Sequence, residues 1–163
     1  MKSILSAIAV IILVSCRGLF EPGDFHLYLK NDSGKAIACL VADKINAGFS
    51  YPDTLLPSAP LYSICITENI VETSEFMGGS AYNYSDILKR RTQKGILSVY
   101  IFSQEDVDEN GWEDVLTNNR YLVRYDLSAK DLDCLKGTIH FPPTEEMKDV
   151  KMSPAYQTVL DNF

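Results

Sequence analysis

The sequence predicts an α+β fold, mainly β: a small antiparallel β-sandwich-like domain with two or three short helices. Three observations support this class. About seven short runs alternate or are rich in apolar and β-branched side chains, turn-forming residues separate them, and no long helical pattern lies between them. Short connections favour antiparallel pairing, because a parallel pair needs a long crossover. A doubly wound α/β fold is therefore disfavoured.

The start of the chain predicts a lipoprotein signal peptide. The cation Lys2 precedes an apolar run over residues 4–14, which is too short to span the ~30 Å hydrocarbon core of a bilayer. The run closes with Leu13-Val14-Ser15-Cys16, which resembles the lipobox of bacterial lipoproteins. The resemblance implies cleavage before Cys16 and lipidation of its thiol. Arg17, in place of the aspartate typical of inner-membrane retention, implies an outer-membrane address facing the periplasm.

The chain accordingly divides into four parts. Residues 1–15 form the signal peptide, and residues 16–24 comprise the lipidated cysteine and a tether. Residues 25–143 form a single globular β-rich domain, which is long enough to bury a core without disulfide staples. Residues 144–163 form a polar C-terminal tail that we expect to be loosely attached.

Charge and cysteine content exclude several functions. The formal charge is −7, and cleavage before Cys16 leaves 14 basic against 22 acidic residues, a charge of −8. Because the basic residues are scattered, nucleic-acid binding is excluded. With two histidines and no C-x-x-C, neither zinc nor a cofactor is predicted. In an oxidising compartment, Cys39, Cys65 and Cys134 leave two alternatives: one disulfide and a buried thiol, or three buried thiols.

The first part of the domain predicts a hairpin followed by an irregular stretch. Residues 25–30 and 36–42 are strand-like, and polar turn residues at 31–34 separate them. Residues 43–60 contain one glycine and three prolines, which break long elements. They leave room for at most a short strand at 54–56.

The middle of the domain predicts a strand, a loop, a helix and a central strand. Residues 61–68 alternate as in a strand, whereas residues 67–84 contain a Gly-Gly pair and predict the least ordered loop. Ser85 predicts the N-cap of a helix over residues 86–92, since an acid opens the helix and three cations close it. Residues 96–102 form the most apolar run of the mature chain and predict a central strand buried on both faces.

The last part of the domain predicts two strands with a helix between them. Residues 121–125 are strand-like, and a turn at 126–128 supplies a serine that forms a capping box with Asp131. The short helix that follows ends before Gly137. Residues 138–141 predict the final strand, which two prolines stop.

The acidic stretch at residues 103–119 predicts a loop that leads into a helical turn at 112–116. Oxygen-bearing side chains stand there at positions 1, 3, 5 and 9 around a glycine, as in a calcium-binding loop. Thr117 stands where such loops carry a bidentate glutamate, so a solvated acidic loop is favoured over calcium binding. The weak calcium candidates are Asp106, Asp108, Asn110 and Asp114.

Acid–base catalysis has only diffuse support. The candidate carboxylates are Asp53, Asp106, Asp108 and Glu113, and no spacing makes two of them face each other. The sequence also contains no G-x-S-x-G element and no phosphate-binding or dinucleotide glycine motif. A small hydrolase that uses Asp or Glu residues is therefore the alternative hypothesis.

Aromatic residues in or near loops suggest a binding surface. In one interpretation their rings form a platform for a glycan or a peptide. In the other, which we favour, the rings pack beneath the loops. The candidate residues are Tyr51, Tyr82, Tyr84 and Trp112.

Several sequence elements resemble a group of small lipoproteins from gut Bacteroidota. The elements are YDLSAKDL at 125–132, TIHFPPTEEM at 138–147 and KMSP at 151–154, with further likeness at 51–54 and 97–102. The resemblance covers most of the mature domain and implies a lipid-anchored single domain. It carries over no activity and no functional residues.

The leading hypothesis is an outer-membrane-anchored periplasmic lipoprotein without enzymatic activity. We expect it to bind a protein or glycan partner through loops at one end of the β-rich domain, and to be held at the membrane by the lipid on Cys16.

Overall fold

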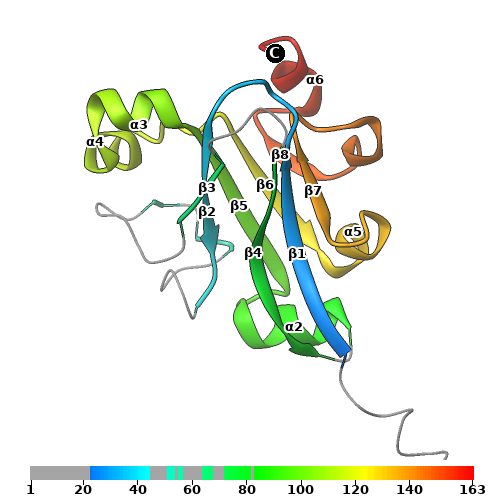
Figure 1. Ribbon diagram of the computed structural model, residues 1–163. Coiled ribbons are helices and arrows are strands. Elements are labelled where there is room, and N and C mark those ends of the chain that lie inside the picture. The colour runs from blue at the N-terminus through cyan, green and yellow to red at the C-terminus, as the bar shows by residue number, and fades with distance from the viewer. Residues whose placement is uncertain (1–22, 45–50, 54, 57–63, 68–71, 82) are drawn as a thin grey trace, which may run out of the picture.

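The computed structural model describes residues 23–44, 51–53, 55–56, 64–67, 72–81 and 83–163. The predicted signal peptide, Cys16 and Tyr82 lie outside these residues. Within the described residues, the chain forms two β-sheets with short helices at their ends and edges (Figure 1). The protein is therefore α+β and mainly β, as the sequence predicts. No helix in this part of the chain is long and apolar enough to cross a membrane.

The smaller sheet has three strands in the order β4-β1-β7. Its central strand is β1 (Gly23–Asn31), which pairs antiparallel with β4 (Glu72–Ala81) and parallel with β7 (Thr138–Phe141). The register of β1 and β4 shifts between Leu27 and Tyr28, which is a β-bulge. The smaller sheet thus joins strands from both ends of the domain.

The larger sheet has five strands, and every neighbouring pair is antiparallel. The central strand β5 confirms the prediction of a central strand buried on both faces. Strand β8 forms one edge of the sheet and lies in the segment predicted as a loose tail. The order across the sheet is β3 (Ile64–Thr67), β2 (Ile37–Ala42), β5 (Ile96–Ser103), β6 (Val123–Ser128) and β8 (Lys151–Ser153).

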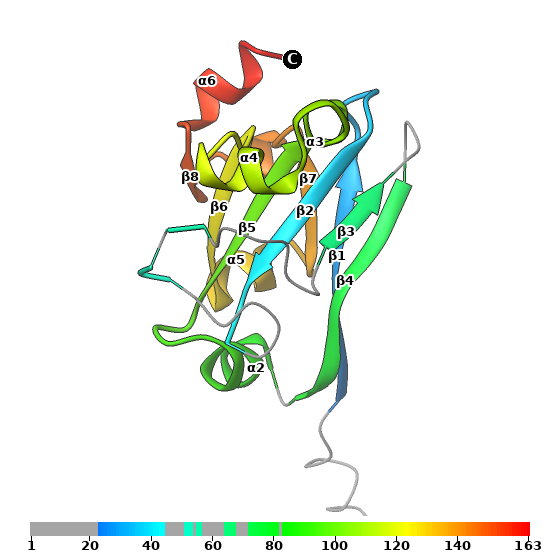
Figure 2. The ribbon, with the colours of Figure 1, turned by 90° about the vertical axis from the view of Figure 1, so that its left-hand side faces the viewer.

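Five short α-helices and a 3₁₀ turn surround the sheets in the described residues, more than the two or three helices expected. Figure 2 shows α3 and α4 near one end of the larger sheet and α2 near the other. The elements are α2 (Tyr84–Arg91), α3 (Gln104–Asn110), α4 (Trp112–Thr117), α5 (Ala129–Cys134), the 3₁₀ turn η1 (Glu145–Met147) and α6 (Tyr156–Leu160).

The main core lies between the two sheets. Leu29 of β1 and Ile139 of β7 pack in one buried cluster with Val99 of β5 and Tyr125 of β6. The hydroxyl of Tyr125 donates to the backbone oxygen of His140 at 3.1 Å, so a hydrogen bond also joins the sheets. Burial of Tyr125 raises its pKa.

A second buried cluster covers the other face of the larger sheet. Tyr100 and Phe102 of β5 pack there against Val115 and Leu116 of α4. Successive residues of β5 therefore enter two different cores, as expected for a strand that is apolar on both faces.

The predicted hairpin of residues 25–30 and 36–42 is wrong, although both strands exist. Strand β1 belongs to the smaller sheet and β2 to the larger one. The buried side chain of Asn31 donates to the backbone oxygen of Lys35 at 2.7 Å and accepts from Ser33 Oγ at 2.7 Å. These contacts fold residues 31–35 into a polar turn that carries the chain from one sheet to the other.

The predicted loop at residues 67–84 is wrong at residues 72–81, which form β4, while residues 68–71 and 82 lie outside the described residues. The ladder of β4 with β1 satisfies the backbone groups that a loop would leave to water. The short strand predicted at 54–56 is wrong at residues 55–56, which have no regular structure, while residue 54 lies outside the described residues.

Two helix starts test the capping predictions. The helix α2 is capped by Asn83 rather than Ser85, since the side chain of Asn83 accepts from the backbone nitrogen of Asp86 at 2.9 Å. The capping box of Ser128 and Asp131 at the start of α5 is confirmed. However, residues 126–128 continue strand β6 and do not form the predicted turn.

Gly137 follows α5 at a position that requires glycine. Its φ angle is +73°, a left-handed conformation that strains other residues. A Cβ atom there would also lie 2.7 Å from the backbone oxygen of His26. The chain therefore passes closely beneath β1 before it enters β7.

Candidate functional site

The predicted loose tail is wrong, because residues 144–163 are built into the domain. Met147, Val150 and Val159 are buried in the main core, and β8 pairs with β6 through Tyr125 and Met152. These apolar residues are widely spaced within a polar stretch, which explains why no periodic pattern showed in the sequence.

An open groove of about 570 Å³ lies between η1, β8 and α6. We call it the C-terminal groove. Met152, Tyr156 and Leu160 are partly buried and supply apolar surface, whereas Lys148, Lys151 and Gln157 are exposed. Apolar surface bounded by a few polar groups is typical of a ligand-binding site.

One polar contact set borders the groove at η1. Lys148 Nζ lies 3.0 Å from Glu145 Oε1, and the hydroxyl of Tyr156 donates to Glu145 Oε2 at 3.4 Å. The hydrogen bond to Glu145 raises the pKa of Lys148. Partial desolvation and the charge of Glu145 raise the pKa of Tyr156. Both side chains therefore stay protonated at neutral pH.

Lys151 connects the groove with the outer face of the larger sheet. Its Nζ lies 3.3 Å from the hydroxyl of Tyr51 and 4.8 Å from the centre of the Tyr51 ring. The same Nζ lies 3.5 Å from Asp126 Oδ2. The hydrogen bond with Tyr51, together with the charge of Asp126, raises the pKa of Lys151, so its ammonium group stays charged.

The carboxylate that contacts Lys151 belongs to a mostly buried group of polar side chains. Asp126, whose side chain is 1% exposed, accepts from Ser98 Oγ at 2.6 Å and from Arg124 Nη2 at 3.1 Å. Burial raises the pKa of the neighbouring Tyr100 to about 12, although Arg124 opposes this shift. We call Asp126, Ser98, Arg124 and Lys151 the Asp126 cluster.

The calcium candidates lie on helices rather than in a loop, so the predicted loop is wrong at residues 104–110, which form α3, while the helical turn predicted at 112–116 is confirmed by α4. On α3 the side chains of Asp106 and Asn110, four positions apart, lie on one face and form a hydrogen bond, whereas Asp108, two positions from each, lies on another face, so the three do not converge on one ion. Asp108 Oδ1 instead accepts from Gln104 Nε2 at 2.8 Å. The described residues contain no group of three His, Cys, Asp or Glu side chains placed to hold a metal.

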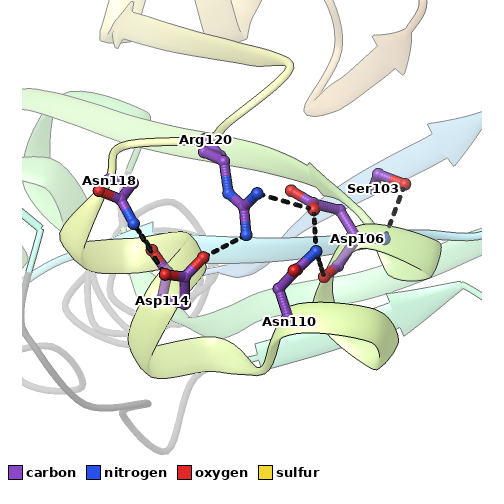
Figure 3. Close-up of polar contacts among 6 residues, drawn as sticks. All are labelled: Ser103, Asp106, Asn110, Asp114, Asn118 and Arg120. Carbon is purple, nitrogen blue, oxygen red and sulfur yellow. Dashed lines mark hydrogen bonds and ion pairs between the residues drawn. The ribbon is translucent and has the colours of Figure 1, made fainter.

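Arg120 brings two of these acids together (Figure 3). Its Nη1 lies 3.4 Å from Asp106 Oδ1, and its Nη2 contacts Asp114 Oδ2. Asn110 and Asn118 donate to the same two carboxylates, at 2.8 and 2.9 Å. We call Arg120, Asp106 and Asp114 the Arg120 cluster. The guanidinium of Arg120 thus takes the place that a calcium ion would have between Asp106 and Asp114.

The described aromatic candidates do not form one platform. Tyr84 is buried on α2 and packs edge-on against Phe25. Trp112 begins α4 and packs edge-on against Phe102, while Tyr51 contacts Lys151. Helices α2 and α4 lie at opposite ends of the molecule (Figure 2), so Tyr84 and Trp112 do not share a surface. Tyr51 contacts Lys151, which lines the C-terminal groove.

Three of the four acids proposed for a hydrolase are engaged in local contacts. Asp53 accepts from the backbone nitrogen of Leu55 at 3.1 Å, while Asp106 and Asp108 make the helix contacts given above. Glu113 lines a shallow cleft of about 340 Å³ beside Asp114, which is paired with Arg120.

The cysteines occupy different environments. Cys39 is buried on β2, where the register places it opposite Cys65 of β3. Cys134 is exposed at the end of α5, which makes the alternative of three buried thiols wrong.

No protein-family model matches the chain, and no curated protein or solved structure matches it either. The class of the protein therefore rests on its own structure: an α+β domain of two sheets with an open groove at its C-terminal edge. The main residues of that groove, Lys151 and Tyr156, did not stand out in the sequence. The short alternation of Val150, Lys151 and Met152 is a signal from which a strand could have been predicted there.

Proposed function

We propose that this chain is an outer-membrane-anchored lipoprotein that faces the periplasm and acts as a non-enzymatic binding module for a protein or glycan. The lipid on Cys16 attaches it to the membrane, and the C-terminal groove receives the partner. The observation that carries the proposal is the groove itself, in which partly buried Met152, Tyr156 and Leu160 lie beside exposed lysines. Apolar surface of this kind favours binding over a purely structural role.

The positions of the two ends of the domain support separate places for membrane attachment and partner binding. Strand β1 begins at the end of the molecule opposite α6 and the C-terminus (Figures 1 and 2). The tether from Cys16 to Gly23 spans at most about 25 Å when fully extended. A lipid attached there would leave the C-terminal groove on the side that faces away from the bilayer.

The anchor is tested by Cys16→Ser in cells. We expect the variant to be processed differently and to leave the membrane fraction, because the acylated thiol is gone. Cys134→Ser is the matched control, since Cys134 is an exposed cysteine of the domain and its loss should leave fractionation unchanged. A Cys16→Ser protein that stays membrane-bound and fully processed contradicts the proposed anchor.

The binding face is tested by photo-crosslinking in cells. A photoreactive residue at exposed Gln157, in the groove, should give adducts with a partner, and one at exposed Glu109, on α3, should not. Equal adducts from both positions would remove the support for the groove.

A further inference from the structure

We propose that the C-terminal groove binds an extended polypeptide segment that carries a carboxylate and adds to the larger sheet along β8. This inference rests on the proposed function and specifies its partner. An added strand would run between β8 and α6, with its main chain on β8 and alternate side chains in the groove.

The backbone of β8 supplies the first argument. Among the strands that the structure describes, β8 is an edge strand, because its one neighbour in the sheet order is β6. An edge strand presents main-chain N–H and C=O groups along its outer side. Among the described residues, residues 151–153 make no main-chain hydrogen bond other than those of the β6 ladder. Polypeptide is the ligand class that carries donors and acceptors at the spacing of such an edge.

The position of the groove supplies the second argument. Lys151 and Met152 of β8 form one wall, and Tyr156 and Leu160 of α6 form the other. Figure 2 shows β8 at the margin of the sheet, with α6 next to one end of the strand. A strand added to this margin would therefore place its side chains against the apolar groups of α6, as extended peptides do when they bind between a strand edge and a helix.

Charge supplies the third argument. The Nζ atoms of Lys148 and Lys151 belong to side chains that are each 62% exposed, whereas the chain as a whole carries a charge of −7. Two lysines and Glu145 give the groove a positive balance on an acidic protein. A carboxylate on the incoming segment would meet these ammonium groups. A second copy of this chain is disfavoured as the occupant, because two such acidic molecules repel each other.

Selection from a phage-displayed library of random heptapeptides tests the proposal, with the full-length lipoprotein held in detergent micelles. We expect the selected peptides to contain Asp or Glu, to be rich in β-branched residues and to lack proline. When the peptides are remade, N-methylation at alternate residues should weaken binding at least tenfold, because it removes main-chain donors. N-methylation at the intervening residues should have little effect.

Two matched variants complete the test. Lys148→Glu should weaken binding of the selected peptides at least tenfold, while Lys130→Glu, an equally charge-changing substitution on exposed α5, should not. Peptides that bind but tolerate N-methylation at every position would overturn strand addition and leave the proposed binding function intact. A library without enriched peptides would also overturn the inference, whereas loss of the crosslink at Gln157 would count against the proposed function itself.

Discussion

The Asp126 cluster and the Arg120 cluster are opposite arrangements of three charges on the outer side of the larger sheet. In the first, one acid stands between two cations, and the side chain of Asp126 is 1% exposed. In the second, one cation stands between two acids, and the side chain of Arg120 is 37% exposed. Each cluster contains two ion pairs, so the difference in burial decides how much each cluster contributes to the stability of the fold.

Burial changes the role of the central charge. Water and salt screen the Arg120 cluster, and exposed ion pairs contribute about 0–1 kcal/mol each. Asp126 and Arg124 have given up most of their hydration, so their two charges depend on each other. We therefore expect the Asp126 cluster to hold β6 and β8 in place beneath the C-terminal groove, and the Arg120 cluster to adjust the packing of α3 and α4.

The largest expected effect follows from Asp126→Ala. The substitution leaves Arg124, which is mostly buried, without its partner, and such a loss costs about 3–5 kcal/mol of unfolding free energy. Asp114→Ala is the matched control at the exposed cluster and should cost less than about 1 kcal/mol. Urea denaturation followed by circular dichroism measures both values. Equal losses for the two variants would show that burial does not separate the clusters.

An intermediate effect is expected for Arg120→Ala. Removal of the guanidinium leaves Asp106 and Asp114 without their shared cation, which should cost about 1 kcal/mol. The loss should shrink when urea denaturation is repeated in 1 M salt, because exposed charges are screened. The loss from Asp126→Ala should persist in the same salt. A salt-independent loss for Arg120→Ala would contradict the distinction.

The smallest effect is expected at Asp32. Like Asp126, it is an acid that contacts two nitrogen-bearing side chains, but like Arg120 it is partly exposed to solvent. Its carboxylate lies 3.2 Å from both Lys30 Nζ and His140 Nδ1, and its side chain is 35% exposed. Desolvation acts to raise its pKa, but the contacts with His140 and Lys30 together lower the pKa below 3.8. Because the lowered pKa belongs to the folded state, the stabilisation is present at neutral pH and is lost as the pH falls through that pKa.

Replacement of Asp32 by Asn measures the stabilisation that the Asp32 carboxylate provides. The stability difference between wild type and Asp32→Asn should be about 0.5 kcal/mol or less at pH 6 and should vanish near pH 2. A difference that grows toward low pH would reverse the assigned sign.

The parts of the fold that could be predicted from sequence are those set by local patterns. The apolar run of β5 and the short run of β7 were identified, as was the capping box at Ser128 and Asp131. These patterns depend on residues a few positions apart. The pairing of distant strands could not be predicted from such local patterns. A polar turn such as residues 31–35 can connect the two strands of a hairpin, but it can equally carry the chain from one sheet to the other.

The candidate site could not be predicted because its residues come together only in the folded chain. Asp126 and Ser98 are 28 residues apart, and Lys151 meets Tyr51 across 100 residues. The acidic helix α3 was mistaken for a loop because Asp and Asn favour turns unless their side chains find partners, as Asp106 does with Asn110. The lipid anchor and the partner remain predictions tested by the experiments above.

The parallel pairing of β1 with β7 has a consequence for the order in which the molecule can assemble. Tyr28 to Asn31 stand opposite Thr138 to Phe141, so the first strand of the domain meets one neighbour only after most of the chain has been made. Pairing across such a sequence separation is slow. A ribosome that releases the chain before residue 138 yields a product whose smaller sheet is a two-stranded ribbon, which is marginal in water. Truncated products should therefore be degraded rather than accumulate.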